Sequence, residues 1–179
     1  HYFGLQASGA EAGAPVRAVI SDGSGAAFAV TTTGYSVNTW HHACAVFRSA
    51  TDRSAYIDGG SRGNNAASRS PTGIDRTRIA RNNVASNALW FSGRIAEAAI
   101  WNVALTDAEV LMLARGINPQ RVRSQSLVGY WPLFGTGSPE PNYGGDPLLN
   151  LTLTGTVQAD HAPRVMIPFA WLGGWPGGF

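Results

Sequence analysis

The chain carries an adjacent histidine pair, His41 and His42, directly after Trp40. Histidine is a common metal ligand and catalytic base, so this pair is the first candidate for chemistry. The surrounding pattern is strand-like, and successive side chains of a strand point to opposite faces of the sheet. The two imidazoles therefore cannot meet at one ion without a bulge, and neither His1 nor His161 lies at a ligand spacing from them. We expect structural roles, with one ring at the edge of the core and the other exposed or bonded to backbone.

Acidic residues could hydrolyse a glycan only if two of their carboxyl groups lay close together on one face of a sheet. A retaining glycosidase holds two carboxyl groups about 5 Å apart, which on one strand requires acids at i and i+2 or i+4. Glu97 stands between Ala96 and Ala98 and has no acidic neighbour at either spacing. Segments 22–25 and 61–63 are interpreted as turns rather than phosphate loops, because neither leads into a helix. We predict that the chain is not an enzyme.

Oxygen donors gather in two Gly-rich turns instead. Asp22 precedes Gly23, and Asp58 precedes Gly59. Carboxylate, amide and backbone carbonyl oxygens are the ligands that calcium prefers. The same residue types also favour tight turns for conformational reasons alone, and both interpretations stay open. Calcium is the one cofactor indicated, and its predicted ligands are Asp58, Asp22, Asn82 and Asn83.

The elements that must position these residues are short strands. With 22 Gly, 10 Pro and 13% charged residues, the composition of this 179-residue chain excludes a coiled coil, a helical bundle and a charged disordered segment. Strand-like runs alternate with Gly, Asn, Asp and Ser clusters, a spacing typical of an all-β sandwich or barrel. The predicted strands are Tyr2–Ser8, Val16–Ser21, Ala26–Thr32, Thr39–Arg48, Ser54–Asp58, Thr77–Arg81, Gly93–Trp101, Leu127–Leu133 and Leu149–Val157.

One helix is predicted, over residues 107–115. Thr106 can cap the first turn while Glu109, three residues on, reaches back to the cap in a capping box. Gly116 stands where a left-handed C-terminal residue belongs, and Pro119 prevents continuation. We expect this helix to pack across one end or edge of the sandwich.

Charge and hydropathy argue against nucleic-acid and membrane partners. All 13 basic residues are Arg, the formal net charge is +2, and the Arg residues between 62 and 81 are not interleaved with aromatic residues. Such a weak field without a stacking surface is not that of a nucleic-acid-binding protein. No stretch approaches the ~20 apolar residues of a membrane span. Cys44 is the single cysteine, and its apolar context favours a buried, unreactive thiol.

Three sequence blocks occur in a meaningful order. They are residues 38–47 with Trp40-His41-His42, residues 55–59 with Tyr56-Ile57-Asp58-Gly59, and residues 91–109 with Gly93-Arg94-Ile95-Ala96-Glu97 before the helix. Together they resemble the laminin-G-like, concanavalin A-like jelly-roll superfamily. The resemblance covers about Tyr2 to Asn118. The ending, residues 159–163 with the aromatic tail, resembles the termini of such proteins, of the kind found in phage and environmental viral structural proteins.

The resemblance implies an all-β fold, a two-sheet antiparallel jelly-roll sandwich with one short helix. It also implies a concave face or loop rim that binds carbohydrate or protein, in some members with calcium. The sequence departs from the family pattern in three ways. The opening strands before Tyr2 are missing, Ala96 stands where an Asp is usual, and the catalytic carboxylate cluster of the related glucanases is absent.

The missing strands leave one sheet edge open, and an open edge pairs readily with another chain. Segment 127–133 looks like the strand with which such domains begin, although here it follows the helix. Our hypothesis is that this segment, or segment 149–157, fills the open edge within the chain or in a neighbouring copy.

The chain is predicted to have three parts. Residues 1–118 form the jelly-roll core, residues 119–158 add C-terminal strands that complete or extend the sandwich, and residues 159–179 are a docking tail rich in aromatic residues, Gly and Pro. Aromatic side chains in such a tail cannot form a core of their own, so they dock on this domain or, as we favour, on a neighbouring subunit. The predicted docking residues are Phe169, Trp171, Trp175 and Phe179.

These features predict a non-catalytic surface or decoration module of a virion or similar extracellular assembly. Its expected partners are protein subunits in a homo- or hetero-oligomer, with glycan as a further ligand. A secreted bacterial carbohydrate-binding or adhesion module is the alternative, and an accessory domain of a polysaccharide-degrading enzyme is the third. The first predicts large buried contacts through the tail, the second a monomer with an exposed aromatic-lined face, and the third an attached catalytic domain.

Overall fold

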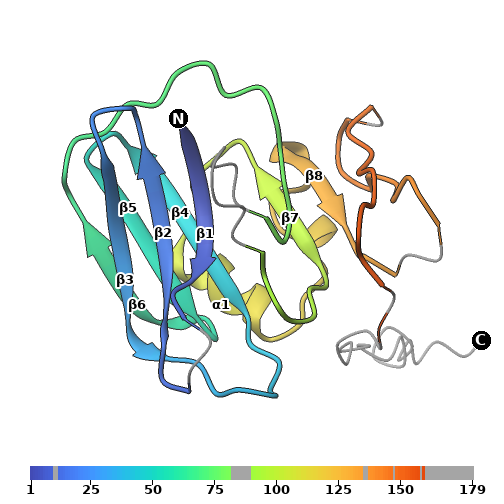
Figure 1. The fold of residues 1–179 in the computed structure, drawn as a ribbon, viewed down its shortest axis with the longest axis horizontal. Helices are drawn as coiled ribbons and strands as arrows, with labels where there is room; N and C mark the ends of the chain where they lie inside the picture. The colour runs from blue at the N-terminus through green and yellow to red at the C-terminus, as the bar shows by residue number, and fades with distance from the viewer. Residues whose placement is uncertain (10–11, 82–89, 135–136, 147, 158, 160–179) are drawn as a thin grey trace, which may run out of the picture.

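Three antiparallel sheets build the described part of the chain (Figure 1). The computed structural model describes residues 1–9, 12–81, 90–134, 137–146, 148–157 and 159. Its elements are β1 (Tyr2–Ala7), β2 (Pro15–Ser21), β3 (Ala26–Gly34), β4 (Ala43–Ser49), β5 (Asp52–Ile57), β6 (Gly60–Asn65), β7 (Ala98–Trp101), α1 (Asp107–Ala114), the 3-10 turns η1 (Pro119–Arg121) and η2 (Ser124–Ser126), and β8 (Leu127–Trp131). Sheets β1-β2-β3 and β4-β5-β6 form a sandwich, and β7 pairs with β8 beside it. The predicted all-β sandwich with one short helix is confirmed.

Small side chains hold the two large sheets together. Ala18 of β2, Ala29 of β3 and Ala55 of β5 are completely buried where the sheets meet. Directly opposed residues of an antiparallel pair share a face, and the register Ala18↔Ala29 turns both methyl groups toward β5. Methyl groups fill little volume, so the sheets can approach closely. A larger residue of the same interior, Phe47, packs against this cluster.

The sandwich is closed along the side where β3 meets β6. Thr33 Oγ1 donates a hydrogen bond to Ser61 Oγ at 2.6 Å. Gly63 lies so close to Val30 that a Cβ atom on Gly63 would overlap the Val30 carbonyl group. Glycine is therefore required at position 63 by the approach of a neighbouring backbone.

On the opposite side, at β1 and β4, no described strand joins the two sheets. Both strands are the outer strands of their sheets, and the rings of Phe3 and Phe47 meet edge-on there with centroids 4.9 Å apart. Phe3 and Leu5 of β1 each remain 48% exposed. Apolar residues of the interior thus reach solvent along this side.

The helix covers part of the outward face of the β4-β5-β6 sheet. Because Ala55 points to the other sheet, its neighbour Tyr56 points outward, where it joins a second hydrophobic cluster. Trp101 of β7 packs on this cluster and donates from Nε1 to Val122 O at 2.7 Å. The buried members of the cluster are Val46, Tyr56, Leu105, Val110 and Val122.

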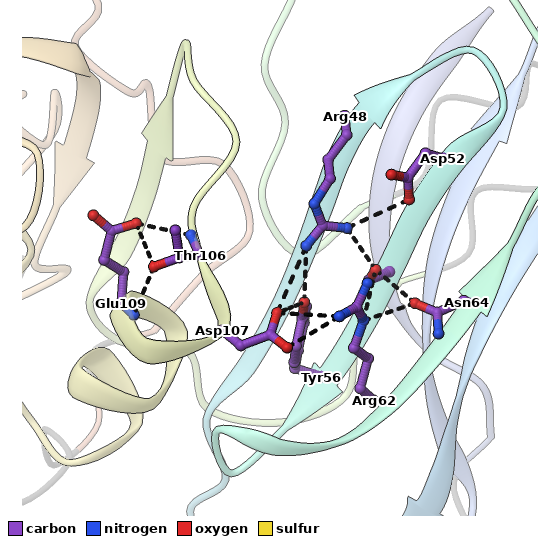
Figure 2. A network of polar contacts seen from close by, with 9 residues as sticks. Arg48, Asp52, Tyr56, Arg62, Asn64, Thr106, Asp107 and Glu109 are labelled. Carbon is purple, nitrogen blue, oxygen red and sulfur yellow. Dashed lines mark hydrogen bonds and ion pairs between the residues drawn. The ribbon is translucent and has the colours of Figure 1, made fainter.

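The ends of α1 follow the predicted signals, although the helix stops at Ala114 rather than Arg115. Thr106 Oγ1 accepts from Glu109 N at 3.3 Å, and Thr106 N donates to Glu109 Oε2 at 2.7 Å, so the capping box is confirmed (Figure 2). Gly116 has the expected left-handed φ of 86°. No helix in the described ranges is long and apolar enough to cross a membrane.

Two predicted strands begin later than expected. Strand β4 starts at Ala43 instead of Thr39, because its partner β5 ends at Ile57, which pairs with Ala43 itself. Strand β7 starts at Ala98 instead of Gly93, because Glu97 has a left-handed φ of 56° that interrupts the extended chain. In both cases the strand-like sequence is longer than the segment that finds hydrogen-bonding partners in a neighbouring strand.

Two further predicted strands do not form. In segment 77–81 only Arg81 bridges to Trp90, and Ala80 has a φ of 64°. In segment 149–157 only Leu151 bridges, to Glu140. Glu140 lies between two prolines, which have no N–H to donate, so this ladder cannot extend.

One strand was missed by the sequence analysis. Strand β6 consists of Gly, Ser, Arg and Asn, residue types with little β propensity. It forms because a tight turn after β5 returns the chain, pairing Ala55 with Gly63 and Arg53 with Asn65. Tertiary contacts override local preference here.

The hypothesis that a C-terminal segment fills the open edge within the chain is wrong for the described residues. Strand β8 pairs with β7, and Leu151 pairs with Glu140. Neither segment reaches β1, which pairs with β2 alone. Among the described strands, the second edge of β1 is therefore left without a partner.

The closed side of the sandwich can be tested at Gly63. We expect Gly63→Ala to lower the free energy of unfolding by about 3 kcal/mol, because the new methyl group displaces the Val30 backbone. Gly60→Ala is the matched control in the same strand, since no atom lies within 4 Å of a Cβ there. Its free energy of unfolding should be unchanged or raised by up to about 1 kcal/mol. Urea unfolding measures both, and equal stability of the two variants would contradict the close contact.

The capping box predicts a pH dependence of stability. Glu109 accepts a hydrogen bond from Arg123 Nε at 2.6 Å, and this bond, together with the backbone N–H of Thr106, lowers the pKa of Glu109 to about 2. An unfolded Glu titrates near ~4.3, so the stabilisation is complete above that pH and is lost as the pH falls toward 2. Glu109→Gln keeps the box but loses the charge, and it should cost about 1 kcal/mol at pH 7.

This cost should disappear in acid, which urea unfolding at a series of pH values can follow. Asp75→Asn, at a carboxylate 73% exposed, serves as the control and should show no such trend. A difference between wild type and Glu109→Gln that stays constant down to pH 2 would refute the assignment.

Candidate binding face

A group of polar side chains lies on the outward face of the β4-β5-β6 sheet, next to the first turn of α1 (Figure 2). Because Ala55 faces the other sheet, Ser54 points outward, and the register Ser54↔Asn64 sets a β6 side chain beside it. We call this group the polar cluster. Its members are Arg48, Asp52, Ser54, Tyr56, Arg62, Asn64 and Asp107.

Tyr56 links the sheet to the helix within the polar cluster. Its hydroxyl donates to Asp107 Oδ1 at 2.6 Å and accepts from Arg48 Nη2 at 3.1 Å. Burial, followed by the bond to Asp107, raises the pKa of Tyr56. The same bond, followed among the stabilising contacts by the charge of Arg62 with Nη1 at 3.0 Å, lowers the pKa of Asp107. At neutral pH the hydroxyl is therefore protonated and the carboxyl group is charged.

Neutral side chains of the sheet hold the two guanidinium groups in place. Arg48 Nη1 donates to Ser54 Oγ at 2.8 Å, and Arg62 Nε donates to Asn64 Oδ1 at 2.8 Å. Ser54 Oγ in turn donates to Asn64 Oδ1 at 2.8 Å. Asp52 is held less tightly, at 3.5 Å from Arg48 Nη1. The two guanidinium groups thus have fixed directions while part of each faces solvent.

The open rim of the polar cluster carries both signs of charge. The side chains of Asp107, Asp52 and Arg62 are 59%, 50% and 38% exposed. The two Arg and two Asp side chains of the polar cluster have no net charge together. The surface therefore presents hydrogen-bond donors next to acceptors and has neither a positive nor a negative potential overall. Such a surface suits a neutral ligand with many hydroxyl groups, each of which donates and accepts.

The histidine pair has structural contacts. His41 and His42 precede β4, and both bind Asp58, through His41 Nδ1 at 2.8 Å and His42 N at 3.0 Å. Ser36 N lies 3.0 Å from His41 Nε2, so the ring is held between Asp58 and the backbone of Ser36. Burial lowers the pKa of His42. The pair thus fixes the loop before β4, in line with the structural roles expected for it.

The predicted calcium ligands Asp58 and Asp22 lie at opposite ends of the sandwich. Asp58 follows β5, whereas Asp22 accepts from Ser70 N at 3.0 Å near the turn that precedes β5, where Arg69 N donates to Ala50 O. A six-residue strand separates these ends by about 20 Å, so the two acids cannot share one ion. No group of three or more His, Cys, Asp or Glu that could hold a metal ion occurs in the described part of the chain. Calcium at either turn stays a prediction.

Neither candidate for hydrolytic chemistry has catalytic geometry. Glu97 accepts a hydrogen bond from the Tyr130 hydroxyl, which ties β7 to β8. Residues 59–63 read Gly-Gly-Ser-Arg-Gly, which matches the Gly-x-Ser-x-Gly pattern of the hydrolase nucleophile elbow, although the sequence analysis interpreted 61–63 only as a turn and found no such elbow. In the structure these residues form the β5–β6 hairpin, not a strand-to-helix turn, and Ser61 Oγ accepts from Thr33.

The remaining site predictions fall outside the described residues. They are the calcium ligands Asn82 and Asn83 and the docking residues Phe169, Trp171, Trp175 and Phe179. The polar cluster, in contrast, was missed by the sequence analysis. The alternation of Asp52, Ser54 and Tyr56 could have indicated it, because these residues share one face of a strand.

The cysteine behaves as its sequence context predicted. Cys44 is a free thiol in β4 that packs against the second hydrophobic cluster. Burial raises the pKa of Cys44 to about 12. The thiol is therefore protonated and unreactive at neutral pH.

The chain is similar to a protein family and to a solved structure. No curated protein matches the sequence. A crystal structure of residues 221–444 of an S-layer domain-containing protein from Clostridium thermocellum is similar at a TM-score of 0.41 and 17% identity; the match covers 56% of this chain and 52%, about half, of that one. A family model for the Concanavalin A-like lectin/glucanases superfamily matches residues 2–111, more than half of the chain and the same region as the three sequence blocks. The chain therefore belongs to the Concanavalin A-like lectin/glucanases superfamily.

Proposed function

We propose that this chain is a non-catalytic carbohydrate-binding module displayed at the surface of a virion or a similar extracellular assembly, and that glycan binds at the polar cluster. The observation that carries the proposal is the polar cluster, a fixed array of exposed donors and acceptors on a rigid sheet. Membership of a superfamily that includes lectins supports carbohydrate as the ligand class.

The geometry of the polar cluster favours hydroxyl-rich ligands. Hydrogen bonds to charged groups are stronger than those between neutral groups, and a carboxylate beside a guanidinium can accept from one sugar hydroxyl while the Arg donates to the next. The side chains are already fixed by their mutual bonds, so little rotamer freedom is lost on binding. Tyr56 is buried beneath the cluster and offers no exposed ring for stacking. Hydrogen bonding is therefore the main source of affinity.

The absence of catalysis is part of the proposal. A glycosidase needs one carboxyl group whose pKa is raised so that it stays protonated as the general acid. In the polar cluster the pKa of Asp107 is instead lowered by the hydroxyl of Tyr56, with the charge of Arg62 acting in the same sense. This carboxyl group is suited to accept hydrogen bonds and not to donate a proton.

Display on an assembly is supported by exposed apolar residues near the C-terminal end of the described chain. Leu148 is 88% and Val157 90% exposed. Apolar side chains this exposed can contribute to contact with another protein. The aromatic residues at 169, 171, 175 and 179 follow in the sequence, and we propose that they dock on a partner subunit together with this region.

Glycan binding can be tested with variants of the polar cluster. The wild-type chain is screened on a glycan array, and the best ligand is titrated by calorimetry into Asp52→Ala and Arg62→Gln. We expect each variant to bind about ten-fold more weakly, because a hydrogen bond to a charged group contributes about 1.5 kcal/mol or more. Asp75→Ala, at an exposed carboxylate in another loop, is the matched control and should bind as wild type.

Two results would count against glycan binding at this site. One is a wild-type chain that retains no glycan on the array. The other is Asp52→Ala and Arg62→Gln proteins whose affinities equal that of Asp75→Ala. A chain that binds glycan as an isolated module, without joining a particle, would instead favour the secreted bacterial adhesion module.

The docking tail gives a separate prediction. Deletion of residues 164–179 should abolish incorporation into particles, followed by sedimentation, while the melting temperature of the sandwich stays the same. A full-length variant with Ser at 169, 171, 175 and 179 controls for length and should show the same loss. Unchanged incorporation after the deletion would rule out docking through the tail.

A further inference from the structure

The backbone of β1 has one side on which no other described strand pairs with it. Just beyond its end, Ser8 N donates to Pro15 O at 2.9 Å, so Ser8 is a hydrogen-bonded position of the β1–β2 ladder. Hydrogen-bonded positions alternate along an antiparallel strand, and the even-numbered residues of β1 therefore bond to β2. Phe3 and Leu5 direct their N–H and C=O groups away from β2, toward a side on which the described chain places no other strand.

The side chains of the same two residues extend the interior of the sandwich. Leu5 lies opposite Ala18 in the β1–β2 register, so it points into the space between the sheets, and Phe3 contacts Phe47 there. Both are 48% exposed. An added strand on this side would cover both residues.

Strand β1 lacks the features that protect other edges. Proteins shield an edge strand with charged residues, proline or a bulge. The sequence Tyr-Phe-Gly-Leu-Gln-Ala contains no charge and no proline, and its register with β2 is regular from Tyr2 to Ala7. The edge is thus competent to pair.

We propose that β1 is a dimerisation strand, which pairs antiparallel with β1 of a second copy about a two-fold axis. The two β1-β2-β3 sheets then become one continuous sheet, and the half-exposed Phe3 and Leu5 of each copy are covered. This inference concerns a different face from the polar cluster and does not depend on glycan binding.

The alternation of side chains selects the register. Phe3 and Leu5 must face odd-numbered residues of the second copy, since a slip of one residue would turn the partner's apolar side chains to the wrong face. A register with Phe3 opposite Leu5 satisfies this rule. The two-fold axis creates two such Phe3–Leu5 pairs, and in each pair the two residues exchange backbone hydrogen bonds. Gly4 then faces Gly4 of the second copy on the axis, as a non-hydrogen-bonded pair with Cα atoms about 4.5 Å apart.

A second copy is the occupant that this edge fits best. It presents the same uncharged strand, so no like charges are opposed across the pair. It also offers the apolar residues in the alternation that the interior requires, because Phe3 and Leu5 are exchanged by the two-fold axis. The contact is self-complementary and closes on itself.

A cysteine at position 4 tests the register. A Cβ atom on Gly4 meets the Tyr2 side chain at 3.5 Å, an ordinary contact, so Gly4→Cys fits the isolated chain. Across the axis its Cα–Cα distance falls within the roughly 4.4–6.8 Å that a disulfide spans. We expect most of the Gly4→Cys protein to become a covalent dimer on mild oxidation, as seen on a non-reducing gel.

Gln6→Cys is the matched control for this experiment. It lies on the same face, but in this register it is about 13 Å from its counterpart, so it should stay monomeric on the gel. Cys44 does not contribute, because burial raises its pKa to about 12. Equal cross-linking of the two variants would overturn the register.

Analytical ultracentrifugation of the full chain tests the dimer itself. Wild type should sediment with twice the chain mass, and Leu5→Lys should shift the protein to monomer. Ile74→Lys, at a residue 45% exposed in a loop, should leave the dimer intact. A monomeric wild type, a dimer that survives Leu5→Lys, or a dimer lost only on deletion of residues 164–179 would overturn the proposal.

Discussion

The close approach of two sheets through very small side chains is the constraint on which this structure depends. Ala18, Ala29 and Ala55 fill the centre of the contact, and Gly63 meets the backbone of the facing sheet directly. Protein interiors are packed to nearly crystalline density, so even one methylene group is felt. At this contact the described residues leave no room for a ligand between the sheets, which favours recognition at the outward faces, the loops and the edges.

The outward face of the β4-β5-β6 sheet serves folding and recognition together. Tyr56 contributes its ring to the hydrophobic cluster under α1 and its hydroxyl to Asp107 at the first turn of that helix. The polar cluster is complete only when the helix is docked, because Asp107 belongs to α1 and the other members belong to the sheet. Burial of the apolar side chains thus fixes the position of the polar ones.

The parts of the fold that local signals determine could be predicted from the sequence. The capping box and Gly116 defined the helix to within one residue, and β1 to β3 follow alternating patterns between Gly-rich turns. The departures have nonlocal causes. Segment 149–157 alternates like a strand but faces a proline-flanked partner, whereas β6 lacks the pattern and is held by its neighbours. The resemblance to a family supplied the architecture, but the polar cluster joins three strands and a helix and needed the observed register.

The sealed β3–β6 side has a consequence for how the protein can associate. A sandwich with two accessible edges could add copies at both ends and grow into a filament, as open heterologous contacts do. Here Thr33 and Ser61 join the two sheets on one side, and Gly63 brings their backbones together. Among the described strands of the sandwich, the flank of β1 is the one on which the two sheets are not joined, so a pairing that uses this flank ends there. The uncharged strand β1 would otherwise promote aggregation, but pairing through it cannot continue into a filament.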